Sequence, residues 1–249
     1  MIMNTLYKIP VLRFFLRLLK YINKSAPLDE FSGYEEYWKK REFVGSINQV
    51  LDRYVIISKE IRSEESVLDF GCGDGAFLAY IQKNRSEVRC AGVDISYEAV
   101  NKAKNKGVDA YNLSHNEKLE SVVPKDWDVI TLMEVLEHYA DAEDIMRQVI
   151  EMRPNRVFVT IPNVGCLKHR LRLAVGGRFP ITSIHFHMKE HIRFWTYKDF
   201  VEWTGMNGLR VVNIWGQFDK GDNIVRFFVK RFPALFATRV VYELAVKNK

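Results

Sequence analysis

The chain has 249 residues, of which 47% are hydrophobic and 27% are charged, and its formal net charge is +6. This is the composition of a globular protein with room for one α/β domain and a buried core. We expect neither a transmembrane helix nor a removable signal peptide, because a run of about 18 apolar residues and a small-residue cleavage site are both missing. The three cysteines, Cys72, Cys90 and Cys166, lack disulfide or metal spacing and fit a reducing compartment, the cytoplasm.

The first predicted element is an amphipathic helix within residues 5–24. Five basic residues precede the first acidic residue, Asp29, and four of them share one helical face: Arg13, Arg17, Lys20 and Lys24. Leucine and phenylalanine occupy mostly the other face, which is typical of a helix that lies in a membrane interface. Two interpretations follow: peripheral contact with the inner face of an anionic membrane, or packing on the protein's own domain or on a partner subunit. The basic and aromatic segment 222–237 is predicted to extend the same surface.

From residue 66 onward, predicted strands and helices alternate. Strands are predicted at 66–71, 88–95, 109–113, 128–135, 156–163, 209–218 and 239–247. Helices are predicted at 75–84, 97–107, 142–153 and 196–208. This succession predicts an α/β fold, with a sheet of seven mostly parallel strands and helices on both faces. The chain divides into an arm at 1–33 and a domain at 34–249, whose insertion at about 164–195 breaks the alternation.

The first predicted strand runs into an acid and three glycines in the stretch VLDFGCGDG at 67–75. Glycine lets a ligand approach the backbone closely, and the helix that follows offers unpaired N–H groups. Asp94 ends the second predicted strand, where a carboxylate suits a ribose diol. The glycine spacing by itself also satisfies a loose dinucleotide pattern. Asp69 argues against a dinucleotide, because a carboxylate there would repel a pyrophosphate and attract the ammonium group of a cofactor built on an amino acid.

Together with this stretch, GVDIS at 92–96 and DVITLMEVLEH at 128–138 resemble the motifs of class I S-adenosylmethionine-dependent methyltransferases. The resemblance covers about residues 34–248. It implies a Rossmann-like sheet with an antiparallel last strand, S-adenosylmethionine as the cofactor and S-adenosylhomocysteine as the product. The cofactor-binding residues that it implies are Asp69, Gly71, Cys72 and Gly73 for the methionine end, Asp94 for the ribose, Ile95, Asn112 and Leu113 for the adenine, and Met133 along the cofactor.

Two further segments resemble parts of related enzymes. GYEEYWKKR at 33–41 is similar to the N-terminal lid of related methyltransferases, which implies that Tyr37 covers the cofactor and that Arg41 pairs with its carboxylate. Ordinary helix packing is the alternative for this segment. Residues 161–180 and 191–200 resemble the MetW-like branch and its small-molecule O-methyltransferase neighbours, and no substrate follows from that resemblance.

Four of the six histidines fall near the expected site. Methyl transfer from a sulfonium to a hydroxyl requires an aligned nucleophile and a group that removes its proton, and histidine suits the second task near neutral pH. We interpret His138, His187 and His191 as candidate catalytic residues and His185 as a substrate contact. The alternatives are a hydrogen bond that shapes the pocket wall for His138 and a structural or surface role for the others. No metal is assigned, because a metal site needs convergent ligands with support behind them.

Residues 168–193 hold six basic residues against one acidic residue, and they overlap the insertion above the expected acceptor pocket. This charge predicts an anionic acceptor, a small molecule, a glycan or a lipid-linked precursor, with Arg170 and Arg172 as its ligands. O-methylation is the favoured reaction. One alternative is nucleic-acid methylation, which the basic charge permits. The fourth strand ends in LMEV, however, and lacks the Asn/Asp-Pro-Pro-aromatic motif of base-amino methyltransferases. The other alternative is a non-catalytic, cofactor-binding partner of a biosynthetic enzyme.

Overall fold

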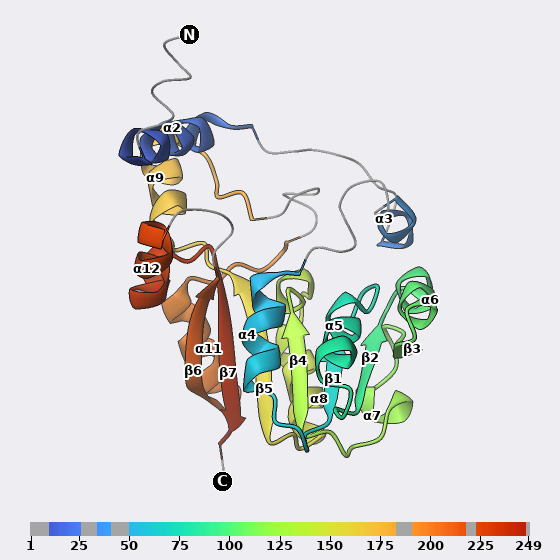
Figure 1. The fold of residues 1–249 in the computed structure, drawn as a ribbon. Coiled ribbons are helices and arrows are strands. Elements are labelled where there is room, and N and C mark those ends of the chain that lie inside the picture. Colours follow the sequence, from blue (N-terminus) through green and yellow to red (C-terminus); the bar gives the residue numbers. More distant parts are fainter. Residues whose placement is uncertain (1–9, 26–33, 41–49, 183–190, 218–222, 248–249) are drawn as a thin grey trace.

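The computed structural model describes residues 10–25, 34–40, 50–182, 191–217 and 223–247. A single sheet of seven strands, in the order β3-β2-β1-β4-β5-β7-β6, forms its centre (Figure 1). The strands are β1 Val67–Phe70, β2 Cys90–Asp94, β3 Asp109–Asn112, β4 Val129–Met133, β5 Arg156–Pro162, β6 Leu209–Gln217 and β7 Arg239–Val246. Strands β1 to β5 pair in parallel, and β7 runs antiparallel to both β5 and β6. The predicted fold class, including the antiparallel last strand, is confirmed.

Helices bury both faces of the sheet. On one face lie α4 Asp52–Glu60, α5 Ala76–Asn84 and α6 Tyr97–Asn105, and on the other lie α8 Ala142–Glu151 and α11 Tyr197–Met206. Val67 packs in the hydrophobic cluster of the first group, whereas Leu68 packs in that of the second. Successive side chains of a strand point to opposite faces, so a strand buried on both sides is apolar at nearly every position. This is why the apolar runs of the sequence predicted the strands well.

The remaining elements lie at the edges of these layers. They are α2 Pro10–Asn23, α3 Tyr34–Lys40, α7 Leu119–Val122, the 3-10 helix η2 Leu136–His138, α9 Leu167–Gly176, α12 Asn223–Arg231 and α13 Pro233–Phe236. Within the described residues, α9 is the helix of the predicted insertion. Figure 1 shows α2 lying across α9, with α12 next to them, and α3 at the opposite side above α6. None of the described helices is long and apolar enough to cross a membrane.

The C-terminal end of α2 is fastened to α9. The guanidinium of Arg172 is buried and donates hydrogen bonds to the carbonyl oxygens of Tyr21, Ile22 and Lys24 at 2.5 to 3.0 Å. These are among the carbonyl groups that a helix end leaves without an intrahelical partner, and a cation there is favourable. The Tyr21 hydroxyl also lies 2.5 Å from Nδ1 of His169. The predicted helix of the arm therefore exists, and its last turn packs on the protein's own insertion.

Candidate active site

The glycine turn follows β1 at the carboxyl edge of the parallel strands. Gly71 and Gly73 have φ values of +74° and +56°, a backbone conformation that favours glycine. A Cβ atom at Gly73 would lie 2.6 Å from Cη2 of Trp38, closer than two carbon atoms can pack. The position therefore requires glycine for two separate reasons, its backbone conformation and the ring against it.

Two buried carboxylates flank this turn. Asp69 accepts a hydrogen bond from the Thr131 hydroxyl at 2.5 Å, and its burial raises the pKa of the carboxyl to about 7. Asp94 accepts hydrogen bonds from the backbone N–H groups of Gly73 and Ser96 at 2.8 and 2.9 Å. Burial raises the pKa of Asp94 to about 6, although these two hydrogen bonds act in the opposite direction. Asp94 ends β2 and Asp69 is the last residue but one of the neighbouring strand β1, so both acids lie toward the same edge of the sheet.

Helix α3 closes over the turn and the start of α6. The Glu35 carboxylate accepts hydrogen bonds from the Ser96 hydroxyl at 2.9 Å and from the backbone N–H groups of Tyr97 and Glu98 at 2.9 and 3.2 Å. It thus caps the N-terminus of α6 from outside that helix, where negative charge is favourable. Lys102 of α6 donates a hydrogen bond in return to the carbonyl oxygen of Trp38. These contacts hold α3 at the cofactor edge.

The side chain of α3 that lies on the glycine turn is Trp38, which is buried. Tyr37, for which the resemblance implied this position, stacks on Tyr34 with ring centroids 5.8 Å apart and meets the edge of Trp38. Arg41 lies outside the described residues. Trp38 and Glu35 stand in the same segment but were assigned no site role from the sequence, because helical spacing alone does not show which side chain faces the turn.

The residues expected around the adenine lie at and just after the carboxyl ends of the neighbouring strands β2 and β3. The Asn112 side-chain amide donates hydrogen bonds to the carbonyl oxygens of Asp94 and Ile95 at 3.1 and 2.8 Å. The backbone N–H of Leu113 donates to the carbonyl of Asp94 at 2.9 Å. Asn112 therefore fixes the segment that carries Ile95. Met133 is half-buried and ends β4, two strands away from β2 across β1.

A second group of polar residues follows β4. Glu134 has φ +60°, a conformation that non-glycine residues adopt rarely, and the chain then enters the short helix η2. One ligand atom each from Glu137, His138 and His191 lies within 4.8 Å of the others. The rings of His138 and His191 meet edge to face, with centroids 4.9 Å apart. The structure thus brings together two of the predicted catalytic histidines from distant parts of the sequence.

The carboxyl groups of this second group lie in unlike surroundings. Burial would raise the pKa of Glu134, but the charges of Arg239, 2.8 Å away, and of Arg53 together with the hydrogen bond from Arg239 outweigh it and hold that pKa below its ordinary value. Glu137 is 1% exposed, and neither of its carboxylate oxygens has a hydrogen-bond partner among the described residues. Burial and the neighbouring charge of Glu134 raise the pKa of Glu137 well above its ordinary value. Neither acid was predicted as a site residue, although both stand in the quoted motif EVLEH.

The two arginines predicted to bind substrate have different positions. Arg170 is exposed, and its Nε donates a hydrogen bond to the carbonyl oxygen of Gly165 at 2.5 Å. Arg172 is 2% exposed and directs its guanidinium at carbonyl groups of α2 and of Phe179. Its role is to join α2 to α9, which replaces the contact with an anionic acceptor expected from the sequence. His185 and His187 lie outside the described residues.

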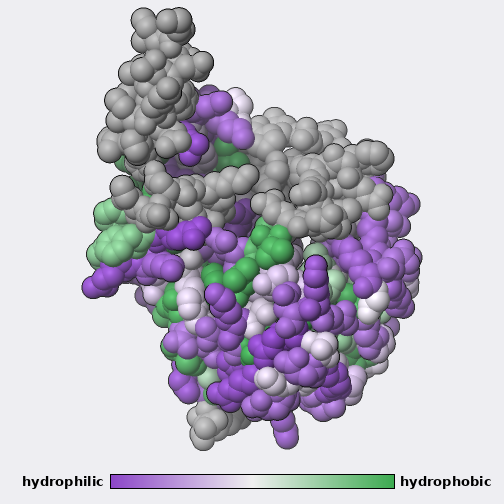
Figure 2. Space-filling view, in the orientation of Figure 1, coloured by the Kyte–Doolittle hydropathy of each residue, from purple (hydrophilic) through white to green (hydrophobic). Residues whose placement is uncertain are grey.

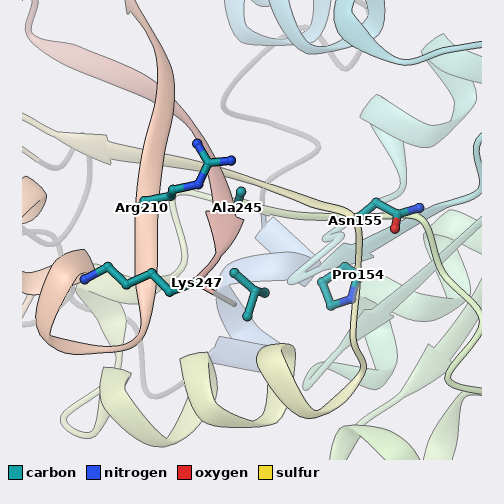
Figure 3. Close-up of a pocket in the computed structure, with 6 residues that line it drawn as sticks. Pro154, Asn155, Arg210, Ala245 and Lys247 are labelled. Carbon is teal, nitrogen blue, oxygen red and sulfur yellow. The ribbon is translucent and has the colours of Figure 1, made fainter. Parts of the chain in front are cut away.

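A recess is present at the other end of the sheet (Figure 3). It is lined by Pro154, Asn155, Arg210, Ala245, Val246 and Lys247. These residues lie at the amino end of β5 and at the ends of β6 and β7 that adjoin it. Ligands of open α/β sheets bind at the carboxyl ends of the parallel strands, so this recess is separate from the candidate active site.

A parallel sheet whose first strand leads from a buried acid into a glycine turn, and whose second strand ends in a buried aspartate, defines a class I S-adenosylmethionine-dependent methyltransferase. The protein is an enzyme of this class, and its cofactor is S-adenosylmethionine. More narrowly, the sequence model of the MetW family, described as methionine biosynthesis protein MetW, matches residues 52–244, and the chain belongs to this family.

Curated relatives include a ubiquinone biosynthesis O-methyltransferase of Coxiella burnetii, which is 25% identical over 73% of this chain and 80% of its own length. Another is a small RNA 2'-O-methyltransferase of Schizosaccharomyces pombe, 27% identical over 55% of this chain and 42% of its own length. Both are O-methyltransferases by name, and their acceptors belong to different chemical classes.

Solved structures share the fold at lower identity. The methyltransferase domain of bacterial CtHen1 is 21% identical, with a TM-score of 0.56 over 81% of this chain and all of that one. The O-methyltransferase NcsB1 from neocarzinostatin biosynthesis, in complex with S-adenosylmethionine and 2-hydroxy-5-methyl naphthoic acid, is 15% identical. Its TM-score is 0.52 over 78% of this chain and 53% of that one. These likenesses support the fold.

Proposed function

We propose that the protein transfers the methyl group of S-adenosylmethionine to an oxygen atom of a negatively charged acceptor, a small molecule, a saccharide or a lipid-linked precursor. The observation that carries the proposal is the contact between His138 and His191 just beyond β4, at the edge of the sheet where the cofactor binds. Groups that take a proton near neutral pH are needed for a hydroxyl acceptor. The names of both curated relatives agree with O-methylation.

The cofactor roles in this proposal follow the edge of the sheet. Asp69, positioned by Thr131, binds the ammonium of the methionine portion beside Gly71, Cys72 and Gly73. Asp94 exchanges its backbone hydrogen bonds for the two ribose hydroxyl groups. The adenine lies along the segment of Ile95, Asn112 and Leu113, and Met133 lies beside the cofactor.

Residues of α3 and α4 complete the cofactor site. Trp38, with the Tyr37 ring edge to face against it, covers the turn. Arg41 and Arg53 are the candidates for the methionine carboxylate. Arg53 stands in the first turn of α4, near enough for its charge to lower the pKa of Asp69.

The reaction is an in-line displacement at the methyl carbon. The acceptor oxygen forms a bond to that carbon while the bond to sulfur breaks, so the sulfonium becomes the thioether of S-adenosylhomocysteine. The hydroxyl proton leaves toward His138 and His191. Because the methyl group has no polar atom that the protein could bind, catalysis depends on the alignment of the acceptor oxygen with the methyl carbon and on removal of this proton.

The acceptor's negative charge is proposed from the basic insertion. With Arg172 occupied by α2, Arg170 is the arginine of the predicted pair that stays exposed near the start of α9. His185 and His187 belong to the same insertion and keep their proposed roles as substrate contact and catalytic residue. Arg170→Glu is expected to raise the KM for the acceptor and to leave the affinity for S-adenosylhomocysteine unchanged. An unchanged KM would remove the support for an anionic acceptor.

Membrane contact is the second part of this proposal. Exposed apolar side chains project from α2, α9 and α12 and the residue after α12: Leu19, Leu173, Val175, Phe227, Phe228 and Phe232. Exposed basic residues of the same helices are Arg17, Lys20, Arg170, Arg226, Lys230 and Arg231. Figure 2 shows green, apolar side chains beside purple, hydrophilic ones at the left edge, where Figure 1 places α12. This mixture is typical of surfaces that rest on anionic lipid and would bring the enzyme to a lipid-linked acceptor.

Flotation with vesicles of phosphatidylglycerol tests this contact. Each basic residue near the surface contributes about 1 kcal/mol, so reversing Arg17 and Lys20 to Glu is expected to weaken vesicle binding by more than about 10-fold. Lys83→Glu with Lys104→Glu, on α5 and α6, is the matched control. Equal flotation of the wild type, the α2 variant and the control would discard the membrane contact.

Turnover tests the reaction itself. Purified protein, labelled S-adenosylmethionine and a panel of acidic phenols, uronic acids, lipid-linked sugars and RNA are incubated together. Label transfer to an oxygen of a small or lipid-linked acceptor supports the proposal. Transfer to RNA alone would overturn the acceptor class in favour of nucleic-acid methylation, and transfer to nitrogen would overturn O-methylation.

A further inference from the structure

Glu137, His138 and His191 form a three-residue cluster on two segments that are tied together. The backbone N–H groups of Ile192 and Arg193 donate hydrogen bonds to the Glu137 carbonyl oxygen at 3.0 and 3.1 Å. Arg193 is itself paired with Glu143 at 2.8 Å. The segment that carries His191 is therefore fixed against η2, and the cluster does not depend on the conformation of an unsupported loop.

Within this cluster, the Glu137 carboxylate is unusual in its surroundings. It is 1% exposed and has no hydrogen-bond partner for either oxygen among the described residues. Buried polar groups almost always have a partner, and a buried carboxylate without one is costly. Asp69 and Asp94, equally buried, do have donors from the protein. A cation that is bound between Glu137 and the two imidazoles would supply the missing partner.

We propose that Glu137, His138 and His191 bind one divalent transition-metal ion at the acceptor side of the active site. Their ligand atoms lie within 4.8 Å of one another, which places them around a common point. Two imidazole nitrogens with a carboxylate suit manganese, iron, cobalt or zinc, whereas magnesium and calcium prefer oxygen ligands. Nδ1 of His191 lies 2.9 Å from the Thr182 hydroxyl, the kind of outer contact that orients a metal-bound imidazole.

The ion deepens the proposed function and rests on it. Three protein ligands leave a coordination position for another oxygen, as in catalytic sites. The acceptor hydroxyl binds there, and the ion lowers its pKa, so its proton leaves to solvent and the oxygen attacks the methyl carbon. His138 and His191 then act as ligands in place of acting as bases. Glu134, held by Arg239, adds negative charge beside the site.

Direct metal titration tests this inference. Protein treated with a chelator is titrated with Mn²⁺, followed by electron paramagnetic resonance, and with Mg²⁺ in competition. We expect one Mn²⁺ per chain, bound more tightly than Mg²⁺. Glu137→Gln and His191→Gln are each expected to weaken Mn²⁺ binding by more than about 10-fold, since even the loss of an outer contact of a metal site commonly costs that much. His115→Ala, an exposed histidine outside the cluster, is the control for surface binding.

Affinity for S-adenosylhomocysteine is measured on the same samples. Retained affinity in both variants shows that they are folded and that their loss of metal is local. Wild-type protein that binds S-adenosylhomocysteine but no Mn²⁺, or variants that bind Mn²⁺ as the wild type does, would overturn the metal site. Tight Mn²⁺ binding without methyl transfer to any oxygen acceptor would instead contradict the proposed function and leave the metal site standing.

Discussion

At the cofactor side, after β1 and β2, the buried carboxylates of Asp69 and Asp94 accept hydrogen bonds from a threonine hydroxyl and from two backbone N–H groups. At the acceptor side, after β4, the equally buried carboxylate of Glu137 has no such partner within the described part of the chain. The carboxylates of the first side are thus held by donors of the protein itself, whereas Glu137 on the second side is near the charges of Arg239 and Arg53 but has no side-chain hydrogen bond among the described residues. This difference agrees with our proposal that a bound metal ion completes the acceptor edge, whereas the fold alone assembles the cofactor edge.

The largest effect on cofactor affinity is expected when Asp94, the acid that ends β2, is removed. Asp94→Ala deletes the acceptor for the ribose hydroxyls and for the Gly73 N–H, and a hydrogen bond to a charged group contributes about 1.5–3 kcal/mol. We expect calorimetry to show a loss of about 100-fold in affinity for S-adenosylhomocysteine. Asp109→Ala, an exposed acid at the start of β3, should change nothing. Equal affinity of the two variants would disprove the ribose role of Asp94.

A smaller effect is expected from a methyl group at the glycine turn. Gly73→Ala combines an unfavourable φ of +56° with a Cβ atom 2.6 Å from the Trp38 ring, so it should displace α3 and weaken cofactor binding by about 10-fold. Gly107→Ala is the matched control, because φ there is +79° and no atom lies within 4 Å of the added carbon. If both variants lose the same affinity, backbone strain alone explains the effect, and Trp38 does not cover the cofactor.

The smallest expected effect is a pH dependence of the affinity for S-adenosylhomocysteine, caused by Asp69 at the cofactor side. Burial raises the pKa of Asp69 to about 7, so the carboxyl is largely neutral below that pH and ionised above it. Only the ionised form attracts the ammonium of S-adenosylhomocysteine, so affinity should increase as pH rises, by about 4-fold between pH 6.5 and pH 8. Asp69→Asn should bind more weakly and with a flat profile. A wild-type affinity that falls with rising pH would contradict the proposed role of Asp69.

The sequence predicted the sheet because buried parallel strands are apolar at nearly every position, and the turn because its glycines are required by the local backbone. In the second half of the site it predicted His138 and His191, but neither their contact nor Glu134 and Glu137, because these depend on side-chain direction across long separations. Arg172 illustrates this: its charge suggested an anionic acceptor, but its guanidinium turns to the carbonyl groups at the end of α2. Glu137 illustrates it again, since its environment exists only once the segment of His191 packs on η2.

The cap that Glu35 places on α6 couples the position of α3 to the first turn of α6, although the two helices are far apart in the sequence. The Glu35 carboxylate accepts three hydrogen bonds at the first turn of α6, so a displacement of α3 would remove the partner of the Ser96 hydroxyl and of the N–H groups of Tyr97 and Glu98, three and four residues beyond Asp94. If the cofactor enters past α3, these hydrogen bonds would break on entry and form again once α3 returns. Salt screens the interaction of the Glu35 carboxylate but does not affect the packing of Trp38. We therefore expect ionic strength to change the rate of cofactor entry more than the affinity for the cofactor.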